Sequence, residues 1–251
     1  MALLGIMFLK SALFDAVEIY IVGYGGWISS PYIGYASLYV KTDINILLDV
    51  GECTYARVIQ CNLPWPDLIF ISHRHGDHIL GLPTFMLMAK RLGKKLKIIA
   101  NRETLEAAKA LAIATGIENT LQYVEFLEAT REVTMGQTRL RFAKTSHPID
   151  TLAVRIEHEG KCATYSSDTA PADVVVELAR GCDILIHEVS GNPGQEDEVH
   201  RVGHSTTVDA IEISKRAGVK MLIPFHFYTE LPIVPPGITV VLPTPCGRVV
   251  I

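Results

Sequence analysis

ISHRHGDHILGLP, residues 71–83, packs imidazole and carboxylate side chains into a short turn directly after an apolar run. These side chains belong to His73, His75, Asp77 and His78. Neutral imidazole nitrogen and carboxylate oxygen are ligands that zinc and related divalent metals take in proteins. A single metal ion cannot readily take all of these ligands from so short a segment. The stretch therefore indicates two adjacent metal ions. The alternative interpretation is a solvated polar loop that is rich in histidine.

The segments on either side of this stretch predict an α/β fold. Apolar or alternating runs predict strands at residues 17–23, 36–42, 44–50, 67–73, 95–100, 137–147, 151–160, 161–168, 183–189 and 220–226. Helices are expected at 83–92, 102–116, 171–181 and 205–218, the last with Ser205 as its N-cap. Two sheets packed face to face with helices outside would satisfy this order of elements. The final segment, 238–251, is expected to form a strand hairpin.

The composition is that of an ordinary globular protein. Of 251 residues, 49% are hydrophobic and 20% are charged, which allows a large core and gives no sign of disorder. The net charge of −4 argues against a uniformly basic surface for nucleic acid, although it leaves room for a local basic patch. The five cysteines are scattered and form no C-x-x-C pair, which predicts a reduced, intracellular protein with buried thiols.

The N-terminus, MALLGIMFLKSALF, is apolar, but it is too short to span a bilayer and Lys10 interrupts it. It also lacks the basic start and the small-residue cleavage site of a secretory signal. We therefore expect residues 1–16 to be an N-terminal extension whose role the sequence leaves open, and the protein to be cytoplasmic, without a membrane partner.

Further candidate donors stand where other apolar strands end. They are Asp49, Glu52, His147, Asp168 and His226. Taken alone, each is more often a polar residue at the end of a strand than a metal ligand. Together they complete a set, because a carboxylate between two divalent ions would let both lie close enough to share a hydroxide.

The motif H-x-H-x-D-H and the later donors follow one another along the chain as they do in the metallo-β-lactamase superfamily, which the chain resembles over residues 17–230. The resemblance implies a four-layer αββα sandwich, a single domain over residues 1–251, with a two-metal site at the edge of the sheets. It implies that His73, His75 and His147 bind one ion, and that Asp77, His78 and His226 bind the other. Asp168 would bridge the two ions, which we expect to be Zn²⁺, with Mn²⁺ or Fe²⁺ as alternatives. Asp49 would orient ligands through hydrogen bonds.

A narrower resemblance is to ribonuclease Z, which trims tRNA 3′ ends. It rests on LLDVGECTYARV (47–58), on DILIHEV with Glu188, and on the H-S-T segment that begins at His204. In that family the glutamate holds the histidine beside the metals, so the resemblance implies that His204 donates a proton to the leaving oxygen. Asp77 is a candidate to accept the proton of the attacking water. The alternatives are a strand-end salt bridge for Glu188 and a helix-cap neighbour for His204.

The chain also departs from ribonuclease Z. Many members carry a long arm that grips tRNA after the third-motif histidine, whereas here PIDTLAVRIEHEG (148–160) follows His147 at once. The Arg-Tyr pair that usually follows the final histidine is replaced by FYTELPIVPPG (227–237), and an early Pro-…-Arg feature is missing. The catalytic residues therefore resemble ribonuclease Z, whereas the tRNA-gripping parts do not.

Two segments are candidates for substrate contact. KRLGKKLK (90–97) is basic enough to bind a nucleic-acid backbone, although cations also favour helix ends. GYGGWISSPYIGY (23–35) carries aromatic side chains that could stack on a base or pack on the edge of the sandwich.

The sequence thus predicts a metal-dependent hydrolase, a ribonuclease Z-like phosphodiesterase acting on RNA or a small phosphodiester. The alternatives are an arylsulfatase, thioesterase or lactonase on the same fold, and a catalytically inactive binding protein. The complete set of ligands argues against the inactive protein. A homodimer is compatible with the resemblance, by analogy alone.

Overall fold

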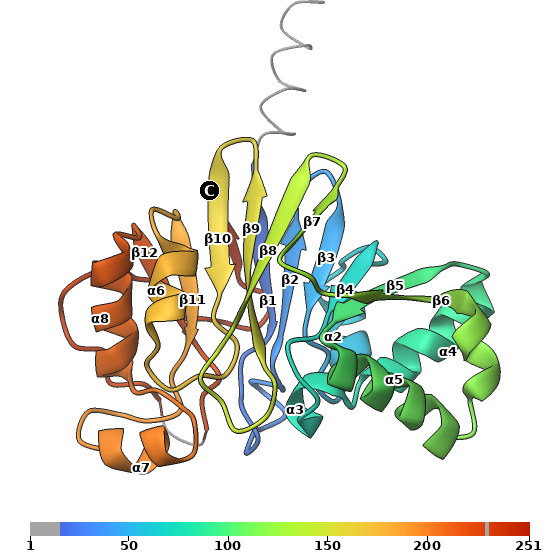
Figure 1. Cartoon of the computed structure of the whole chain (residues 1–251), viewed down its shortest axis with the longest axis horizontal. Coiled ribbons are helices and arrows are strands. Elements are labelled where there is room, and N and C mark those ends of the chain that lie inside the picture. Colours follow the sequence, from blue (N-terminus) through green and yellow to red (C-terminus); the bar gives the residue numbers. More distant parts are fainter. Residues whose placement is uncertain (1–15, 229–230) are drawn as a thin grey trace, which may run out of the picture.

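The computed structural model describes residues 16–228 and 231–251, which form two β-sheets packed face to face with helices on the outer faces (Figure 1). The expected αββα sandwich is therefore confirmed. The predicted N-terminal extension, apart from residue 16, lies outside the described residues. That a single domain spans residues 1–251 stays a prediction.

The first sheet has the strand order β14-β1-β2-β3-β4-β5-β6. Its strands β1 to β3 pair antiparallel, whereas β3 to β6 pair parallel. The carboxyl ends of β3, β4 and β5 therefore meet at one edge of the sheet. The strands are β1 (Glu18–Gly23), β2 (Ser37–Lys41), β3 (Asn45–Leu48), β4 (Leu68–Phe70), β5 (Leu96–Ala100), β6 (Val124–Glu128) and β14 (Arg248–Val250).

The second sheet has the strand order β13-β12-β11-β10-β9-β8-β7. Its strands β10 to β13 run parallel, so that their carboxyl ends also share one edge. The strands are β7 (Glu132–Met135), β8 (Thr138–Lys144), β9 (Leu152–His158), β10 (Lys161–Tyr165), β11 (Ile184–Glu188), β12 (Met221–Phe225) and β13 (Thr239–Val240).

Helices cover the outer faces of both sheets (Figure 1). Beside the first sheet lie α2 (Thr54–Gln60), α3 (Gly76–Ile79), α4 (Leu82–Leu92), α5 (Arg102–Ala114) and the 3₁₀ helix η1 (Glu118–Tyr123). Beside the second lie α6 (Asp173–Ala179), α7 (Glu196–Arg201) and α8 (Thr207–Ala217). The described residues contain no helix that is long and apolar enough to cross a membrane.

Apolar packing holds these layers together. Phe70 of the first sheet stacks on Phe142 of the second, with ring centroids 5.6 Å apart. On the outer face, Phe85 of α4 meets Tyr55 of α2 edge to face at 5.4 Å. Burying a large apolar side chain stabilises a fold by about 1.5–3 kcal/mol, so this packing fixes the sheets and positions the strand ends that carry the site.

Two sequence predictions about the second half are wrong. Residues 238–251 form no hairpin: β13 extends the second sheet beside β12, whereas β14 crosses to the first sheet and pairs with β1. The N-cap of α8 is Thr206 rather than Ser205, because Thr206 and Asp209 form a reciprocal capping box. Ser205 instead donates its hydroxyl to the Thr169 carbonyl, 2.7 Å away.

The cysteines also differ from the prediction. Cys61 is bonded to Cys246, and Cys162 to Cys182, across sequence separations of 185 and 20 residues. Cys53 is the free cysteine, and it is exposed rather than buried. The expectation of reduced thiols is wrong for these four cysteines, whereas the expected burial holds for Cys162 and Cys182. The sequence did not reveal the pairing, because cysteines so far apart form no local motif. The first disulfide joins the end of α2 to the segment that leads into β14.

Replacing Cys61 tests this disulfide. In a non-reducing buffer, Cys61→Ser is expected to lower the free energy of unfolding by about 2–4 kcal/mol, because the bridge restricts the unfolded chain. Urea denaturation measures the change, and Cys53→Ser, which removes the free thiol, serves as the matched control with unchanged stability. Thiol titration of the denatured wild type should detect Cys53 alone; reaction of Cys61 or Cys246 would contradict the pairing.

Candidate metal centre

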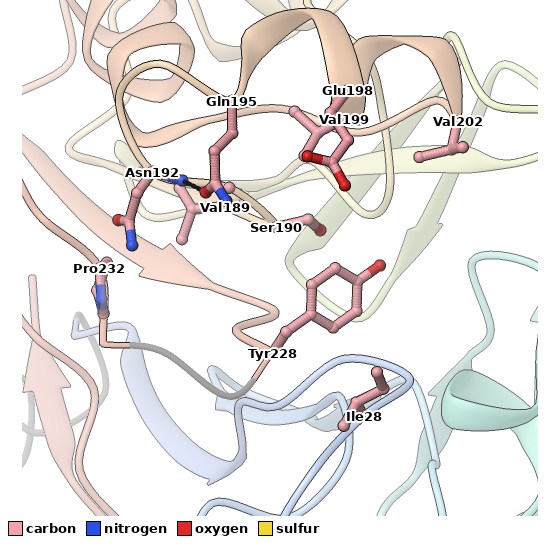
Figure 2. Close-up of a pocket in the computed structure, with 11 residues that line it drawn as sticks. Ile28, Val189, Ser190, Asn192, Gln195, Glu198, Val199, Val202, Tyr228 and Pro232 are labelled. Atoms are coloured by element: carbon pink, nitrogen blue, oxygen red, sulfur yellow. Dashed lines mark hydrogen bonds between the residues drawn. The ribbon is translucent and has the colours of Figure 1, made fainter.

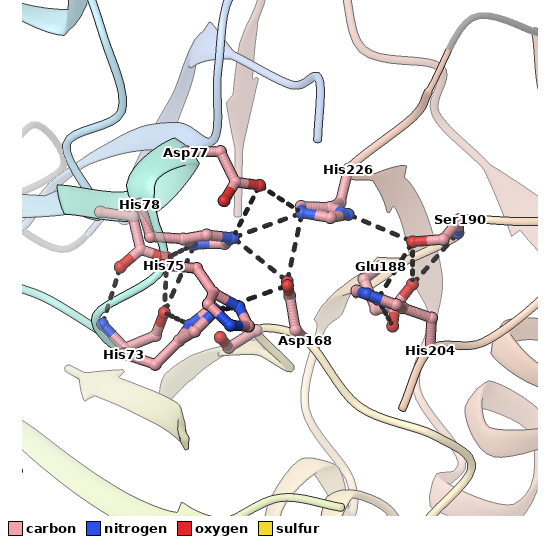
Figure 3. A network of polar contacts seen from close by, with 12 residues as sticks. His73, His75, Asp77, His78, Asp168, Glu188, Ser190, His204 and His226 are labelled. Atoms are coloured by element: carbon pink, nitrogen blue, oxygen red, sulfur yellow. Dashed lines mark hydrogen bonds and ion pairs between the residues drawn. The ribbon is translucent and has the colours of Figure 1, made fainter. Parts of the chain in front are cut away.

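The loop after β4 delivers the first donors. The strand ends at Phe70, and α3 begins at Gly76, so the chain turns sharply between the two elements. His73 lies before this turn and is fully buried, whereas His78 projects from α3 and is equally buried. The carboxyl end of β4 thus places the loop at the edge where the two sheets meet (Figure 3).

One group of donor atoms gathers around His75. Its Nδ1 lies 3.0 Å from His73 Nε2 and 3.2 Å from His147 Nε2, and His147 follows β8 of the other sheet. Asp168, which follows β10, places Oδ2 3.5 Å from His73 Nε2. Each of these residues offers one ligand atom, and the four atoms lie within 4.8 Å of one another.

A second group gathers around His226, which follows β12. Its Nε2 lies 3.1 Å from Asp77 Oδ2 and 3.3 Å from His78 Nε2. Asp168 joins this group through its other oxygen, since Oδ1 lies 3.3 Å from His78 Nε2 and 3.4 Å from His226 Nε2. Asp168 therefore faces both groups, one with each carboxylate oxygen (Figure 3).

The donor atoms of both groups fit divalent metal ions. Several imidazole nitrogens converge at about hydrogen-bond distance, and a cation between them would satisfy their lone pairs together. Burial, and then the imidazole of His78, hold the pKa of His73 well below its ordinary value, which favours the neutral form that a metal binds.

The carboxylates of the centre are ionised and are stabilised by nearby positive charge. Burial opposes a charge on His78, but the carboxylates of Asp168 and Asp77 outweigh it and raise the His78 pKa well above its usual value. Burial likewise opposes a charge on Asp168, yet the imidazoles of His226 and His78 hold its pKa well below the usual range. The carboxylates therefore remain charged and attract a cation.

Asp49 fixes the orientation of the second group. Its Oδ2 lies 2.8 Å from His78 Nδ1, so the opposite ring nitrogen, Nε2, faces the centre. The carboxylate also accepts hydrogen bonds from the Ser72 backbone N–H at 2.7 Å, the Ser72 hydroxyl at 2.8 Å and the Tyr165 hydroxyl at 2.7 Å. Asp49 was predictable from the sequence, whereas Tyr165 was not, because a tyrosine on a buried strand looks like an ordinary core residue.

Gly26 is a further residue of the site that the sequence did not predict. A Cβ at this position would lie 2.6 Å from Cε1 and 2.8 Å from Nδ1 of His226, which is too close for any side chain. The Gly26 backbone N–H also donates to the Phe227 carbonyl at 2.7 Å. Gly26 therefore lets the loop after β1 pack directly on the His226 ring.

Glu188 and His204 stand beside both groups of donors. Nδ1 of His204 lies 2.9 Å from Glu188 Oε1, and its ring centroid is 5.1 Å from that of His147 and 5.5 Å from that of His226. Burial lowers the pKa of His204, but Glu188 outweighs burial and raises it to about 9. With Nδ1 bonded to Glu188, Nε2 is the nitrogen that can exchange a proton with a substrate.

Glu188 is held by many donors. It accepts hydrogen bonds from the backbone N–H groups of Thr169, Ser190 and Ser205, each at 3.1 Å. Its atoms could also complete a third metal-binding group with His204 and His226. These backbone donors occupy the lone pairs of its oxygens, however, which favours a role as the anchor of His204.

The other sequence candidates lie in different places. Glu52 is exposed and lines a cavity with Trp27, Tyr35 and Asp77. Lys94, Lys95 and Lys97 line another cavity at the amino end of β5, whereas the site lies at the carboxyl ends of the strands.

The aromatic loop contributes at the site itself. Trp27 is 60% exposed and meets the His75 ring edge to face at 6.2 Å. Tyr32 is also exposed, whereas Tyr24 is buried against Phe227. Trp27 and Tyr35 of this loop therefore both border the donors, Trp27 at the His75 ring and Tyr35 in the cavity that Asp77 also lines.

Comparison with known proteins agrees with this site. The family model described as the Beta-lactamase superfamily domain matches residues 45–227, so the chain belongs to that superfamily. Within it, the chain is a metal-dependent, ribonuclease Z-like hydrolase. Ribonuclease Z of Ignicoccus hospitalis is 28% identical over 243 residues, which cover 73% of this chain and 78% of that protein.

Solved structures share the fold. The metallo-β-lactamase fold protein YhfI from Bacillus subtilis matches with a TM-score of 0.80 and 18% identity, over 94% of this chain and 99% of that one. The short form of human tRNase Z matches with a TM-score of 0.79 and 20% identity, over 92% and 98%. The arm that many ribonuclease Z members carry is missing here, since residues 148–151 lead from His147 directly into β9.

Gly26→Ala tests the packing of His226. The added methyl group is expected to displace the His226 ring and to weaken metal binding by the group that contains it about 10- to 100-fold. Binding by the group around His75 should be unchanged. Titration against a competing chelator measures both affinities.

Gly93→Ala is the matched control for this substitution. Gly93 ends α4 with φ +63°, and a Cβ there would meet nothing within 4 Å, so its cost is backbone strain away from the site. Metal affinities of Gly26→Ala equal to those of Gly93→Ala would contradict the role of Gly26.

Proposed function

We propose that this protein is a phosphodiesterase with two divalent metal ions, preferably Zn²⁺, acting on RNA or a small phosphodiester. The proposed ligands of one ion are His73, His75 and His147, and those of the other are Asp77, His78 and His226. Asp168 is proposed to bridge them, because its two oxygens face different groups. Bound metal ions supply a nucleophile at neutral pH by lowering the pKa of water.

The buried pair of Glu188 and His204 is the observation that carries this proposal. A ribose oxygen is a poor leaving group and needs a proton as its bond to phosphorus breaks, whereas a thiolate or a phenolate leaves more readily. The His204 ring lies beside His147 of one group of donors and His226 of the other, and Glu188 supports its positive charge. A buried proton donor at this place favours a phosphodiester over a thioester or an aryl sulfate.

The residues of the chain divide the reaction between them. The oxygen of the attacking water forms the new bond to phosphorus, and Asp77 accepts the proton that the water loses. The bond from phosphorus to the leaving oxygen breaks with its electron pair on that oxygen, and His204 Nε2 donates the proton that neutralises it. Glu188 keeps the His204 ring in place and is a positioning residue.

The substrate must be bound without the arm of ribonuclease Z. Trp27 is exposed beside His75 and offers a surface on which a base could stack. The lysines at the amino end of β5 lie away from the centre, so they are not part of the proposed substrate path. The homodimer and the cytoplasmic location stay predictions.

His204→Ala tests the role of the proton donor. It is expected to lower kcat on a dinucleoside phosphate about 100-fold or more, with little change in KM. The loss on bis(p-nitrophenyl) phosphate should stay below about tenfold, because p-nitrophenolate leaves without a proton. His200→Ala is the matched control, since His200 pairs with Asp209 on the α7–α8 side of the fold. Equal losses on both substrates would contradict the proton-donor role.

Metal removal tests the centre and the substrate class. Chelation is expected to abolish hydrolysis, and activity should return in full at two equivalents of Zn²⁺ per chain. The restored enzyme should cleave bis(p-nitrophenyl) phosphate faster than a sulfate ester or a thioester, and a precursor tRNA assay decides whether tRNA is a substrate. Full activity at one equivalent would contradict the two-metal site, and faster cleavage of the thioester or the sulfate ester would contradict the phosphodiesterase.

A further inference from the structure

A cavity of about 350 Å³ opens beside His204, between Tyr228 and α7 (Figure 2). Ser190 and Tyr228 both line it and both contact His204: the Ser190 hydroxyl lies 3.2 Å from Nδ1, and the Tyr228 hydroxyl lies 3.5 Å from Nε2. The cavity is therefore adjacent to His204, the proposed proton donor. The substituent on the leaving oxygen, which takes the proton from His204, would extend into this cavity.

The walls of the cavity suit a flat ring. The Tyr228 ring packs against the imidazoles of His204 and His226, with centroids 6.2 and 5.9 Å apart, so its orientation is fixed. Val189 and Val199 are buried side chains on the opposite wall. An aromatic face opposite aliphatic side chains is the surface on which proteins stack unpaired bases.

The polar residues at the rim of the cavity determine whether a neutral or a charged ligand is favoured. Glu198 of α7 extends toward Tyr228, whereas Gln195, the N-cap of α7, accepts a hydrogen bond from the Asn192 backbone N–H at 2.6 Å (Figure 2). A carboxylate accepts hydrogen bonds and repels anions, so Glu198 disfavours a second phosphate in this space. It favours a neutral ring that carries N–H donors, such as the exocyclic amino group of adenine, cytosine or guanine.

A second cavity lies on the other side of the loop after β1. Trp27, Tyr35 and Asp77 line it, whereas Ile28 of the same loop lines the first cavity. A phosphodiester has two substituents, and the proposed general base, Asp77, and the proposed acid, His204, border different cavities. The cavity beside His204 is therefore on the leaving side of the scissile bond.

We propose that the cavity between Tyr228 and α7 binds the nucleoside that departs with the leaving oxygen, and that Glu198 makes it prefer a base with an amino group over uracil. This inference rests on the proposed phosphodiesterase function. It assigns Tyr228 as the stacking surface and Glu198 as the residue that determines specificity.

Dinucleoside phosphates test the preference. One series varies the base on the 5′ side and another varies it on the 3′ side, with uridine as the constant partner. The position of the phosphate on the products identifies the leaving nucleoside. The wild type is expected to prefer cytosine over uracil about tenfold in kcat/KM on the leaving side, with a smaller preference on the other side.

Glu198→Gln should reduce this preference to about one, because the neutral amide also donates hydrogen bonds and accepts uracil. Asp197→Asn is the matched control: it removes one charge from the same helix, but Asp197 does not line the cavity, so the preference should persist. A wild-type preference that survives Glu198→Gln, or that appears on the non-leaving side alone, would overturn the assignment.

Tyr228 provides a second, independent test. Tyr228→Phe keeps the ring and should leave KM for a dinucleoside phosphate within about twofold, whereas Tyr228→Leu should raise it about tenfold by removing the stack. Equal KM values for the two variants would contradict stacking. Wild-type protein that cleaves neither dinucleoside phosphates nor bis(p-nitrophenyl) phosphate would refute the proposed function, whereas cleavage without base preference refutes this inference alone.

Discussion

The burial of Asp168 between two groups of imidazoles is the constraint on which the rest of the site depends. A carboxylate taken out of water is stable only where opposite charge or hydrogen-bond donors face it. The first sheet supplies His73 and His78, and the second sheet supplies His226 and Asp168 itself. The centre therefore exists only when both sheets are packed together, which couples the apolar core to the chemistry at its edge.

The backbone is strained at several positions where these donors are brought together. Asp49, Ser167 and His226 adopt positive φ values of 56°, 52° and 63°, a conformation that residues other than glycine rarely take. Each of them lies directly after a strand or next to a proposed ligand. Such strain persists only where the surrounding structure holds it in place. Here the four contacts of the Asp49 carboxylate and the packing of Gly26 on His226 provide that restraint.

The donors were predictable from the sequence because they follow one another in a recognisable order at the ends of apolar strands. The strands and helices that carry them were also predictable, since β4 lies in a continuous apolar run and α8 has clear apolar periodicity. Residues that act through a close contact with a distant part of the chain were not predicted. Gly26, Tyr165 and Tyr228 look ordinary in the sequence, because their effect depends on a partner far along the chain. The disulfide between Cys61 and Cys246 was not predicted for the same reason.

The sequence by itself determined the layered α/β fold and the chemical type of the centre, because hydrophobic periodicity and the H-x-H-x-D-H motif are local patterns. Tertiary structure decided which donors meet: Asp168 faces two groups only because β10 lies beside β11 and the two sheets meet at their carboxyl ends. It also decided that the cavity at Tyr228 opens beside His204. Distances between residues remote in the chain follow from packing, and no local pattern in the sequence records them.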